Sequence, residues 1–245
     1  MHLQGKAAIV TGASRGIGRA IAERLASLGA SVVINYAANR DKAEEAVESI
    51  VKRGGRAIAV QADVSRVGDV EKLFADAVSE LGKVDILVNN AGVIDYRLIG
   101  DVTEADFDRL FAINVKGTYF ACQQAMKRME EGGRIVNFST SVVGSMLPAY
   151  SVYAATKGAV EQMTRQLAKE FGPKRITINA IAPGPVRTEL FMTGKTQEQI
   201  DATSQANAFR RLGEPEDIAN AVELLVSDRS GWITGQTIRA NGGSN

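Results

Sequence analysis

The sequence predicts an α/β fold in which a doubly wound, seven-stranded parallel sheet carries helices on both faces. Two observations predict this fold. Short β-branched runs alternate with longer segments that carry apolar residues at helical spacing, which is typical of βα units around a buried parallel sheet. There are seven of these runs, and right-handed crossovers between them would place helices on both sides of the sheet about a switch point.

The expected elements follow one another in a regular order. Ile21, Leu25 and Leu28 mark a helix between the first two strands. Another helix, marked by Val160, Met163 and Leu167, lies between the fifth and the sixth. The expected strands are Ala7–Thr11, Ser31–Asn35, Ala57–Gln61, Ile86–Asn89, Arg134–Phe138, Thr177–Ala182 and Thr237–Arg239.

Composition predicts one globular domain over residues 1–245. The chain is 45% hydrophobic and 23% charged, and a domain of its length buries about 70–75% of the surface of the unfolded chain. No linker or low-complexity tract divides it. The stretch from Pro183 to Arg211 lacks a clear core pattern. Residues 188–211 within it are expected to form a lid over a site, with a plain surface excursion as the alternative.

Charge and rare residues exclude several classes of function. With 29 basic and 28 acidic residues, the chain lacks the positive excess that nucleic acid or an anionic membrane would attract. It shows neither a signal-peptide pattern nor an apolar run of about 18 residues, so a cytoplasmic protein is expected. Cys122 is the only cysteine, expected as a small buried residue on a helix, and His2 is the only histidine. A Ser-His-Asp triad or a histidine-rich zinc site therefore cannot form, and no metal is expected.

A glycine-rich turn follows the first strand directly. It reads Thr11-Gly12-Ala13-Ser14-Arg15-Gly16-Ile17-Gly18 and leads into a helix. Glycines at such a turn let the backbone approach a pyrophosphate, which then meets the free N–H groups of the helix N-terminus. A merely tight βα turn would give the same pattern, so the turn alone indicates dinucleotide binding weakly.

The end of the second strand favours NADP(H) over NAD(H). An acidic residue usually holds the ribose 2′-hydroxyl about 20 residues past the glycines. Here the strand ends Ile34-Asn35-Tyr36-Ala37-Ala38 and offers no carboxylate. Arg15 in the turn can pair with a 2′-phosphate, and Arg40 just beyond the strand can help.

Further polar motifs follow the later strands. Asp63-Val64 comes after the third strand and Asn89-Asn90-Ala91-Gly92 after the fourth. Tyr153 and Lys157 stand four apart on a helix, so they share one face and the ammonium can lie near the phenol. A surface pair would have the same spacing.

Taken in order, these motifs resemble those of the short-chain dehydrogenase/reductase family, from Lys6 to about Gly243. Asn114, the pair Pro183-Gly184, and Thr188 complete the resemblance. It implies a Rossmann fold, hydride transfer to or from NADP(H) on a small-molecule carbonyl or alcohol, and a homotetramer. The residues expected to bind the cofactor are Gly12, Ser14, Arg15, Gly16, Ile17, Gly18, Tyr36, Arg40, Asp63, Val64, Asn90, Ala91, Gly92, Tyr153, Lys157, Pro183, Gly184, Val186 and Thr188.

The resemblance also implies the catalytic roles. Tyr153 is the proton donor, and Lys157 serves both the phenol and the nicotinamide ribose. Asn114 anchors a water that relays protons. A phenol titrates near 10, and a cation within about 4–6 Å lowers its pKa by about 1–3 units, so Lys157 and the oxidised nicotinamide together would make Tyr153 a usable acid or base near neutrality.

One catalytic hydroxyl has two candidates. The family spacing of thirteen residues before Tyr153 falls on Thr140, whereas Ser141 begins a segment that resembles the one the catalytic serine usually starts. Ser141 is preferred because its hydroxyl rotates freely and strand ends often bulge beside active sites.

Two alternative functions remain open beside a carbonyl reductase. One is a 3-oxoacyl-[acyl-carrier-protein] reductase, which would use a basic docking patch; Lys127, Arg128, Lys174 and Arg175 could form it, although Glu130 and Glu131 intrude. The other is a non-catalytic NADP(H)-binding sensor or scaffold, and the presence of Asn114, Tyr153 and Lys157 speaks against it.

A helix is expected over Ala105–Met129, and it is apolar on more than one face, with Phe107 and Phe111 early and Tyr119 and Phe120 later. This helix and the one that begins near Tyr150 are predicted to pack against a two-fold mate in the homotetramer.

Overall fold

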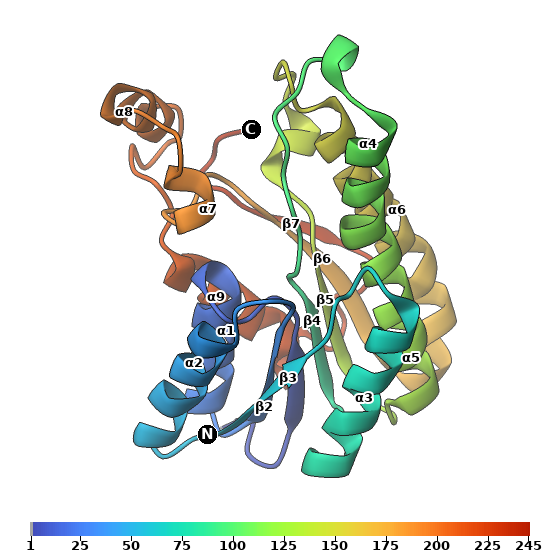
Figure 1. Ribbon diagram of the computed structural model, residues 1–245. Coiled ribbons are helices and arrows are strands. Elements are labelled where there is room, and N and C mark those ends of the chain that lie inside the picture. The colour runs from blue at the N-terminus through green and yellow to red at the C-terminus, as the bar shows by residue number, and fades with distance from the viewer. Residues whose placement is uncertain (1) are drawn as a thin grey trace.

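A computed structural model of the protein describes residues 2–245 and contains one seven-stranded parallel sheet with strand order β3-β2-β1-β4-β5-β6-β7 (Figure 1). Each expected strand is present, with ends that differ by no more than one residue from those predicted. The strands are β1 (Ala7–Val10), β2 (Ser31–Tyr36), β3 (Arg56–Gln61), β4 (Ile86–Asn89), β5 (Arg134–Phe138), β6 (Thr177–Pro183) and β7 (Thr237–Ala240).

Helices cover both faces of this sheet, as the alternating pattern predicted (Figure 1). On one face lie α1 (Gly16–Ser27), α2 (Arg40–Lys52) and α9 (Pro215–Val226). On the other lie α3 (Val67–Leu81), α4 (Glu104–Phe111), α5 (Thr118–Arg128) and α6 (Ser151–Phe171). Two shorter helices, α7 (Glu189–Met192) and α8 (Gln197–Gln205), stand apart beyond the carboxyl ends of the strands.

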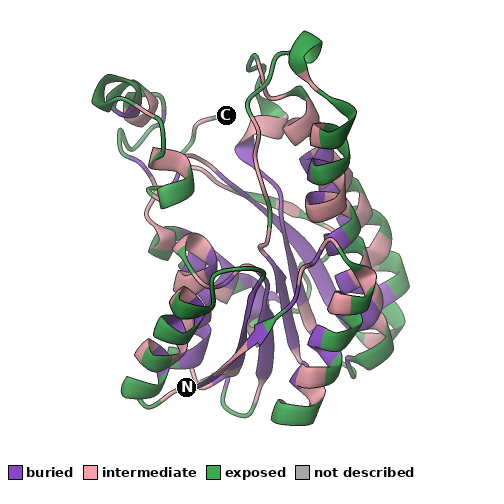
Figure 2. Cartoon of the chain, in the orientation of Figure 1, coloured by how far each residue is buried: buried purple, intermediate pink, exposed green. Residues whose placement is uncertain are grey.

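The strands are buried on both faces, which fixes their register. In β1, Ala8 and Val10 enter the core under α1 and α9, whereas Ile9 enters the core under α3 and α5. The central strands are accordingly purple throughout in Figure 2. A shift of one residue would exchange these two sets of side chains between the cores, so the alternation holds the pairing in place.

The segment expected as one helix over Ala105–Met129 is broken in the middle. Between α4 and α5 the chain makes a π-helical turn over Ala112–Gly117, and α5 ends at Arg128. The hydroxyl of Thr118 donates to the carbonyl of Asn114 at 2.9 Å, and such bonding to the preceding turn bends helices. The expected helix is therefore present to within one residue at each end, with a π-helical turn in its middle that was not expected. A π turn often marks a functional site.

The strand order reverses between β1 and β4, so the loops that follow these two strands diverge above the sheet. The glycine turn follows β1, and Asn90–Gly92 follows β4. In α/β sheets a ligand binds in the crevice at this place. Among residues 2–245, no helix is both long and apolar enough to span a bilayer.

Candidate active site

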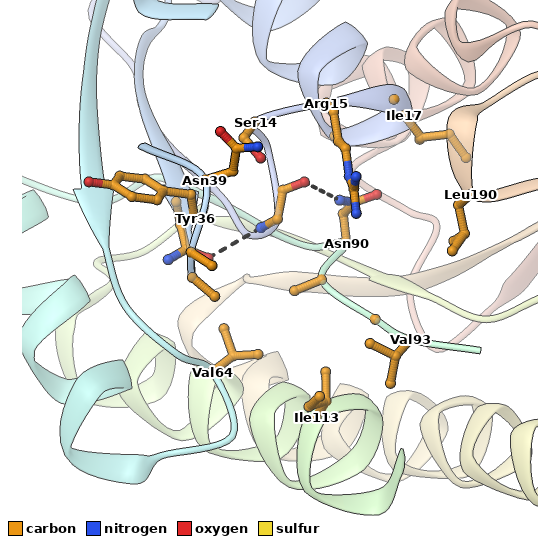
Figure 3. Close-up of a pocket in the computed structure, with 18 of the residues that line it drawn as sticks. Ser14, Arg15, Ile17, Tyr36, Asn39, Val64, Asn90, Val93, Ile113 and Leu190 are labelled. Carbon is orange, nitrogen blue, oxygen red and sulfur yellow. Dashed lines mark hydrogen bonds between the residues drawn. The ribbon is translucent and has the colours of Figure 1, made fainter. Parts of the chain in front are cut away.

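The glycine turn after β1 is held by side chains of neighbouring strands. The amide of Gly12 donates to Oδ1 of Asn35 at 3.2 Å, and Nδ2 of Asn90 donates to the carbonyls of Thr11 at 2.9 Å and Gly12 at 3.1 Å (Figure 3). Gly12 has φ +63°, a conformation that glycine adopts without strain. A Cβ at Gly18 would lie 2.5 Å from both Asn90 Nδ2 and the Gly12 carbonyl, so no other residue fits there without a shift.

This turn opens onto the first of two cavities at the carboxyl ends of the strands. The cavity has a volume of about 640 Å³. Helix α1 begins beside it at Gly16 without a side-chain cap, which leaves its first N–H groups free to meet a phosphate. The expected cofactor-binding residues that line it are Gly12, Ser14, Arg15, Gly16, Ile17, Gly18, Tyr36, Asp63, Val64, Asn90, Ala91, Gly92 and Thr188.

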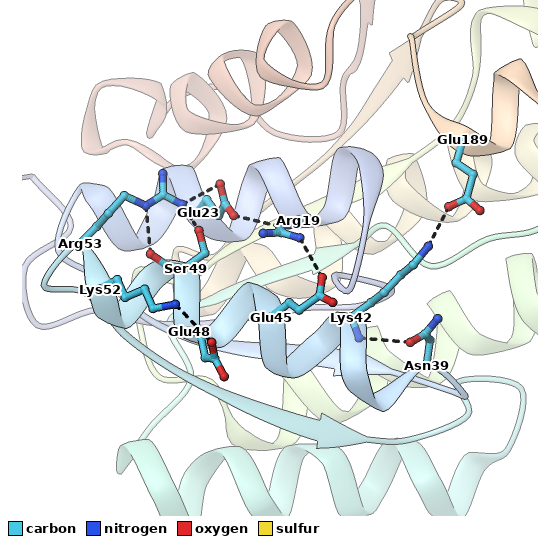
Figure 4. A network of polar contacts seen from close by, with 10 residues as sticks. All are labelled: Arg19, Glu23, Asn39, Lys42, Glu45, Glu48, Ser49, Lys52, Arg53 and Glu189. Carbon is cyan, nitrogen blue, oxygen red and sulfur yellow. Dashed lines mark hydrogen bonds and ion pairs between the residues drawn. The ribbon is translucent and has the colours of Figure 1, made fainter.

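At the edge of this cavity, two cations meet one carboxylate. Arg15 Nη1 and Lys42 Nζ each lie 3.1 Å from Oε2 of Glu189, which projects from α7, and both cations lower the pKa of that carboxyl, Lys42 more than Arg15 (Figures 3 and 4). Tyr36 is the last residue of β2, and the two residues after it, Ala37 and Ala38, carry no carboxylate. The chemistry of this edge therefore suits a group more negative than a ribose hydroxyl.

Arg40 is not part of this cluster. Its side chain is 74% exposed, pairs with Glu44 along α2 and lines neither cavity. Lys42, which sequence reasoning missed, takes its place. Two positions along a helix turn a side chain by about 200°, and only knowledge of where α2 begins reveals which of the two cations reaches Glu189.

The second cavity, also about 640 Å³, brings together the expected catalytic residues Thr140, Ser141, Tyr153 and Lys157. Pro183, Gly184 and Val186 line it as well. The two cavities share a wall, so molecules bound in each would lie next to one another. The residues that line both are Ile17, Asn90, Gly92, Val93, Ile94, Thr188 and Leu190.

Tyr153 and Lys157 lie on the face of α6 that borders this cavity, as their spacing predicted. The ammonium of Lys157 is 5.9 Å from the centre of the Tyr153 ring, and it donates to the carbonyl of Phe138 at 2.8 Å. This hydrogen bond connects α6 to the end of β5 and fixes the position of Lys157 beside Tyr153.

Burial dominates the ionisation of this pair. It raises the pKa of the Tyr153 phenol to about 12, although a hydrogen bond with Thr140 acts in the opposite direction. It lowers the pKa of the Lys157 ammonium to about 8. Removal from water disfavours both charged forms, and the lowering of the phenol pKa that was expected from Lys157 together with the oxidised nicotinamide stays a prediction.

The hydroxyl beside Tyr153 belongs to Thr140. The preference for Ser141 required a bulge, but the backbone stays extended through Thr140, with φ −160° and ψ 150°. Ser139 points the other way and donates to Glu161 at 2.6 Å, while Ser141 already begins a 3₁₀ turn. Thr140 is the hydroxyl that acts on the pKa of Tyr153, and Ser141 lines the same cavity, so this geometry favours Thr140 while the choice between the two stays a prediction.

Asn114 lies behind the cavities and is fully buried. Its amide donates to the carbonyl of Val93 at 2.9 Å and to the hydroxyl of Thr156 at 3.1 Å, and it accepts from the amide of Val93 at 2.9 Å. A Cβ at Gly92 would lie 3.2 Å from Asn114 Oδ1 and 3.4 Å from Lys157 Nζ. The Asn114 side chain thus positions the loop after β4 beside Lys157.

An aromatic wall in the second cavity was not anticipated from the sequence. Tyr96 and Tyr150 meet edge to face with ring centres 5.1 Å apart, and Tyr150 lies 6.4 Å from Tyr153. Phe191 and Lys195 line the same cavity from the segment that includes α7. These residues come from loops without a repeating pattern, and the sequence offered no spacing that could have found them.

Known proteins resemble this chain over its whole length. A family model described as Enoyl-(Acyl carrier protein) reductase matches residues 12–245. A short-chain type dehydrogenase/reductase of Picea abies is 45% identical, over 98% of this chain and 93% of its own length.

Two solved structures share the fold closely. A short-chain dehydrogenase of Burkholderia cenocepacia in complex with NADP has a TM-score of 0.96 and is 36% identical, with 100% of both chains covered. An angucycline C-6 ketoreductase with bound NADP has a TM-score of 0.94 and is 42% identical, with 99% and 96% covered. By fold, by site and by these matches, the chain belongs to the short-chain dehydrogenase/reductase family of oxidoreductases.

Proposed function

We propose that this protein is an NADP(H)-dependent carbonyl reductase, with Tyr153 as the proton donor. The observation that carries the proposal is the shared wall of the two cavities, with Tyr153 and Lys157 lining the second of them. One cavity suits a dinucleotide because it lies at the glycine turn and the N-terminus of α1. The other suits an apolar carbonyl compound.

Each catalytic side chain has a task that its surroundings support. Bound nicotinamide supplies the hydride, and the chain supplies placement and the proton. With a pKa of about 12, Tyr153 is protonated at neutral pH and can give its proton to the carbonyl oxygen. Lys157, with a pKa of about 8, is then a cation that stabilises the phenolate left behind. The Thr140 hydroxyl donates a second hydrogen bond to the carbonyl oxygen.

NADP(H) is proposed over NAD(H) because Arg15 and Lys42 converge where the 2′-phosphate would lie and no carboxylate ends β2. Two structural relatives contain NADP according to their descriptions. Glu189 pairs with both cations, so a 2′-phosphate would take over partners that this carboxylate holds.

A reductase acting on acyl carrier protein remains the alternative, since the matching family model carries such a description. The expected basic patch does not favour it. Lys127 and Arg128 end α5, and Lys174 and Arg175 follow α6, so all four lie where β5 and β6 begin, at the opposite end of the sheet from the cavities. Lys174 is also engaged with the carbonyls of Met126 and Met129.

The proposal is tested by NADPH oxidation with a panel of ketones, 3-oxoacyl thioesters and sugars. We expect turnover with apolar ketones. Tyr153→Phe should reduce the rate to background while NADPH binding stays nearly unchanged, since the change removes the proton but little cofactor contact. Substantial activity in Tyr153→Phe would contradict the role of Tyr153. NADPH binding without turnover by the wild type would favour the sensor.

A further inference from the structure

The second cavity has an uneven charge. Of the residues that line it, the charged ones are Lys157 and Lys195, and no carboxylate is among them. Lys157 is buried, bonded to the carbonyl of Phe138 and adjacent to Tyr153. Within residues 2–245, Lys195 has no hydrogen bond of the kind that Lys157 makes, and it forms no ion pair. It is the cation of this cavity that remains available to a ligand.

Aromatic rings hold Lys195 in place. Its ammonium lies 5.2 Å from the ring centre of Tyr96 and 4.4 Å from that of Phe191. Tyr96 belongs to the segment after β4, and Phe191 belongs to α7, so the ammonium sits between the two sides of the cavity. Cation–π contact orients an ammonium but leaves its N–H donors free for an acceptor oxygen.

Lys195 lies at the far end of a row of rings that begins at the proposed proton donor. Tyr150 is 6.4 Å from Tyr153, Tyr96 is 5.1 Å from Tyr150, and Lys195 follows Tyr96. Leu147 and Leu190 add apolar surface to the cavity. Flat ring systems pack well against ring edges and faces of this kind. A flat ligand with its carbonyl at Tyr153 can lie against these rings and present its other end to Lys195.

We infer that Lys195 determines specificity by binding an anionic oxygen, carried by an aromatic ketone at the end opposite to the carbonyl that is reduced. The inference rests on the proposed function and adds the substrate class to it. An extended aromatic ketone with a carboxylate or an ionised phenol would pack against the aromatic wall and pair its charge with Lys195. The cavity has no acidic residue that would repel it. A neutral ketone of the same shape leaves the cation without an anion.

The experiment compares two probes of matched shape: 1-tetralone with a carboxylate on its aromatic ring, and the methyl ester of the same compound. The measured quantity is the ratio of kcat/KM for the acid to that for the ester with NADPH at pH 7. We expect the wild type to prefer the acid by about 10- to 100-fold, the range of one charge-assisted contact.

Variants at Lys195 test whether this residue causes the preference for the acid. Lys195→Met should bring the ratio to about 1, mainly through KM of the acid, since the contact is equally present before and during the reaction. Lys195→Arg should keep most of the preference, and Lys195→Glu should reverse it. Lys52→Met is the matched control because Lys52 is 76% exposed and pairs with Glu48 on α2; this variant should keep the wild-type ratio.

Two results would overturn the inference: a wild-type ratio near 1, or an unchanged ratio in Lys195→Met. Equal losses of kcat/KM on both probes in Lys195→Met are one form of the second result, and they would mean that Lys195 only holds the α7 segment against Tyr96. Calorimetric binding of the two probes to the enzyme with NADP⁺ separates this inference from the proposed function. If neither probe turns over but the acid binds more tightly only with Lys195 or its Arg replacement, the proposed function fails and the anion site stands.

Discussion

Tyr153 and Lys157 are buried groups whose pKa values have moved in opposite directions, to about 12 and about 8. Both shifts favour the neutral form. The phenol consequently keeps its proton through the neutral range, which suits a donor, while the ammonium titrates close to physiological pH. Catalytic sites often separate their acids and bases in this manner.

These shifts predict how stability depends on pH. The folded protein releases the Lys157 proton near pH 8, whereas the unfolded chain holds it to about pH 10.5. Within this window the unfolded state binds more protons, so Lys157 makes the free energy of unfolding rise with pH. Tyr153 acts in the opposite direction only above pH 10. Urea unfolding at pH 7.5 and 9.5 measures the rise.

Lys157→Met removes the titrating group, so its free energy of unfolding should increase less between these two pH values than that of the wild type. Exposed lysines titrate alike in both proteins and cancel in the comparison. The same increase in both proteins would show that burial does not shift the Lys157 pKa.

Thr140 is expected to supply the hydroxyl that polarises the carbonyl. Thr140→Val keeps the shape of the side chain but removes the hydroxyl, and kcat should fall by about 10²–10³, as for loss of one oxyanion donor. Thr140→Ser should restore most of the rate, and Ser141→Ala should stay near the wild type. Steady-state ketone reduction measures all three. A normal rate in Thr140→Val with a large fall in Ser141→Ala would return the role to Ser141.

At the scale of elements, three helices meet at the proposed 2′-phosphate site. Arg15 precedes α1, Lys42 belongs to α2 and Glu189 opens α7, and the carboxylate bridges the two cations. Figure 4 shows the pair of Lys42 and Glu189. Glu189 belongs to the proposed lid, and its two ion pairs connect that segment to α2 and to the turn before α1.

Cofactor affinity tests this cluster. Arg15→Ala should weaken NADPH binding by about tenfold and NADH binding far less. This is the lower end of the range for a charge-assisted bond, because Arg15 is 56% exposed. Glu189→Gln should tighten NADPH binding, since it removes a competing anion. Fluorescence titration of the wild type and of both variants with each cofactor gives the six affinities. Equal effects on NADPH and NADH, or a wild-type preference for NADH, would contradict the assignment.

Sequence patterns predicted helices and strands well where burial makes apolar residues recur at regular spacing. Ile9 and Val33 enter one core, and their neighbours in the same strands enter the other, so the strands could be placed to within a residue. The π turn around Asn114 has no such period, so spacing along the chain gives no sign of it. The contacts of Lys195 depend on how two loops fold, and spacing along the chain carries no information on that.

At the scale of the molecule, apolar side chains remain exposed on helices α4 and α5. Phe107 is 43% exposed and Tyr119 is 47% exposed, although both lie on helices whose other faces are buried. This surface supports the expectation that these helices and the start of α6 pack against a two-fold mate.

Light scattering at micromolar concentration should therefore give the mass of four chains. Phe107→Lys together with Tyr119→Lys should reduce that mass, because two buried cations would face their symmetry mates. Urea unfolding at matched protein concentration checks that the variant still folds. A monomeric wild type would contradict the tetramer.

The central claim is that hydride passes directly from NADPH to a carbonyl carbon while Tyr153 provides the proton. Its most direct test uses NADPH that carries deuterium at C4, prepared in each of the two stereochemical forms, with mass spectrometry and NMR of the alcohol. We expect one form to deliver its deuterium to the carbinol carbon and the other to deliver none, and Tyr153→Phe to yield no labelled alcohol. Alcohol formed without deuterium from either form, or labelled alcohol produced at the wild-type rate by Tyr153→Phe, would contradict the account.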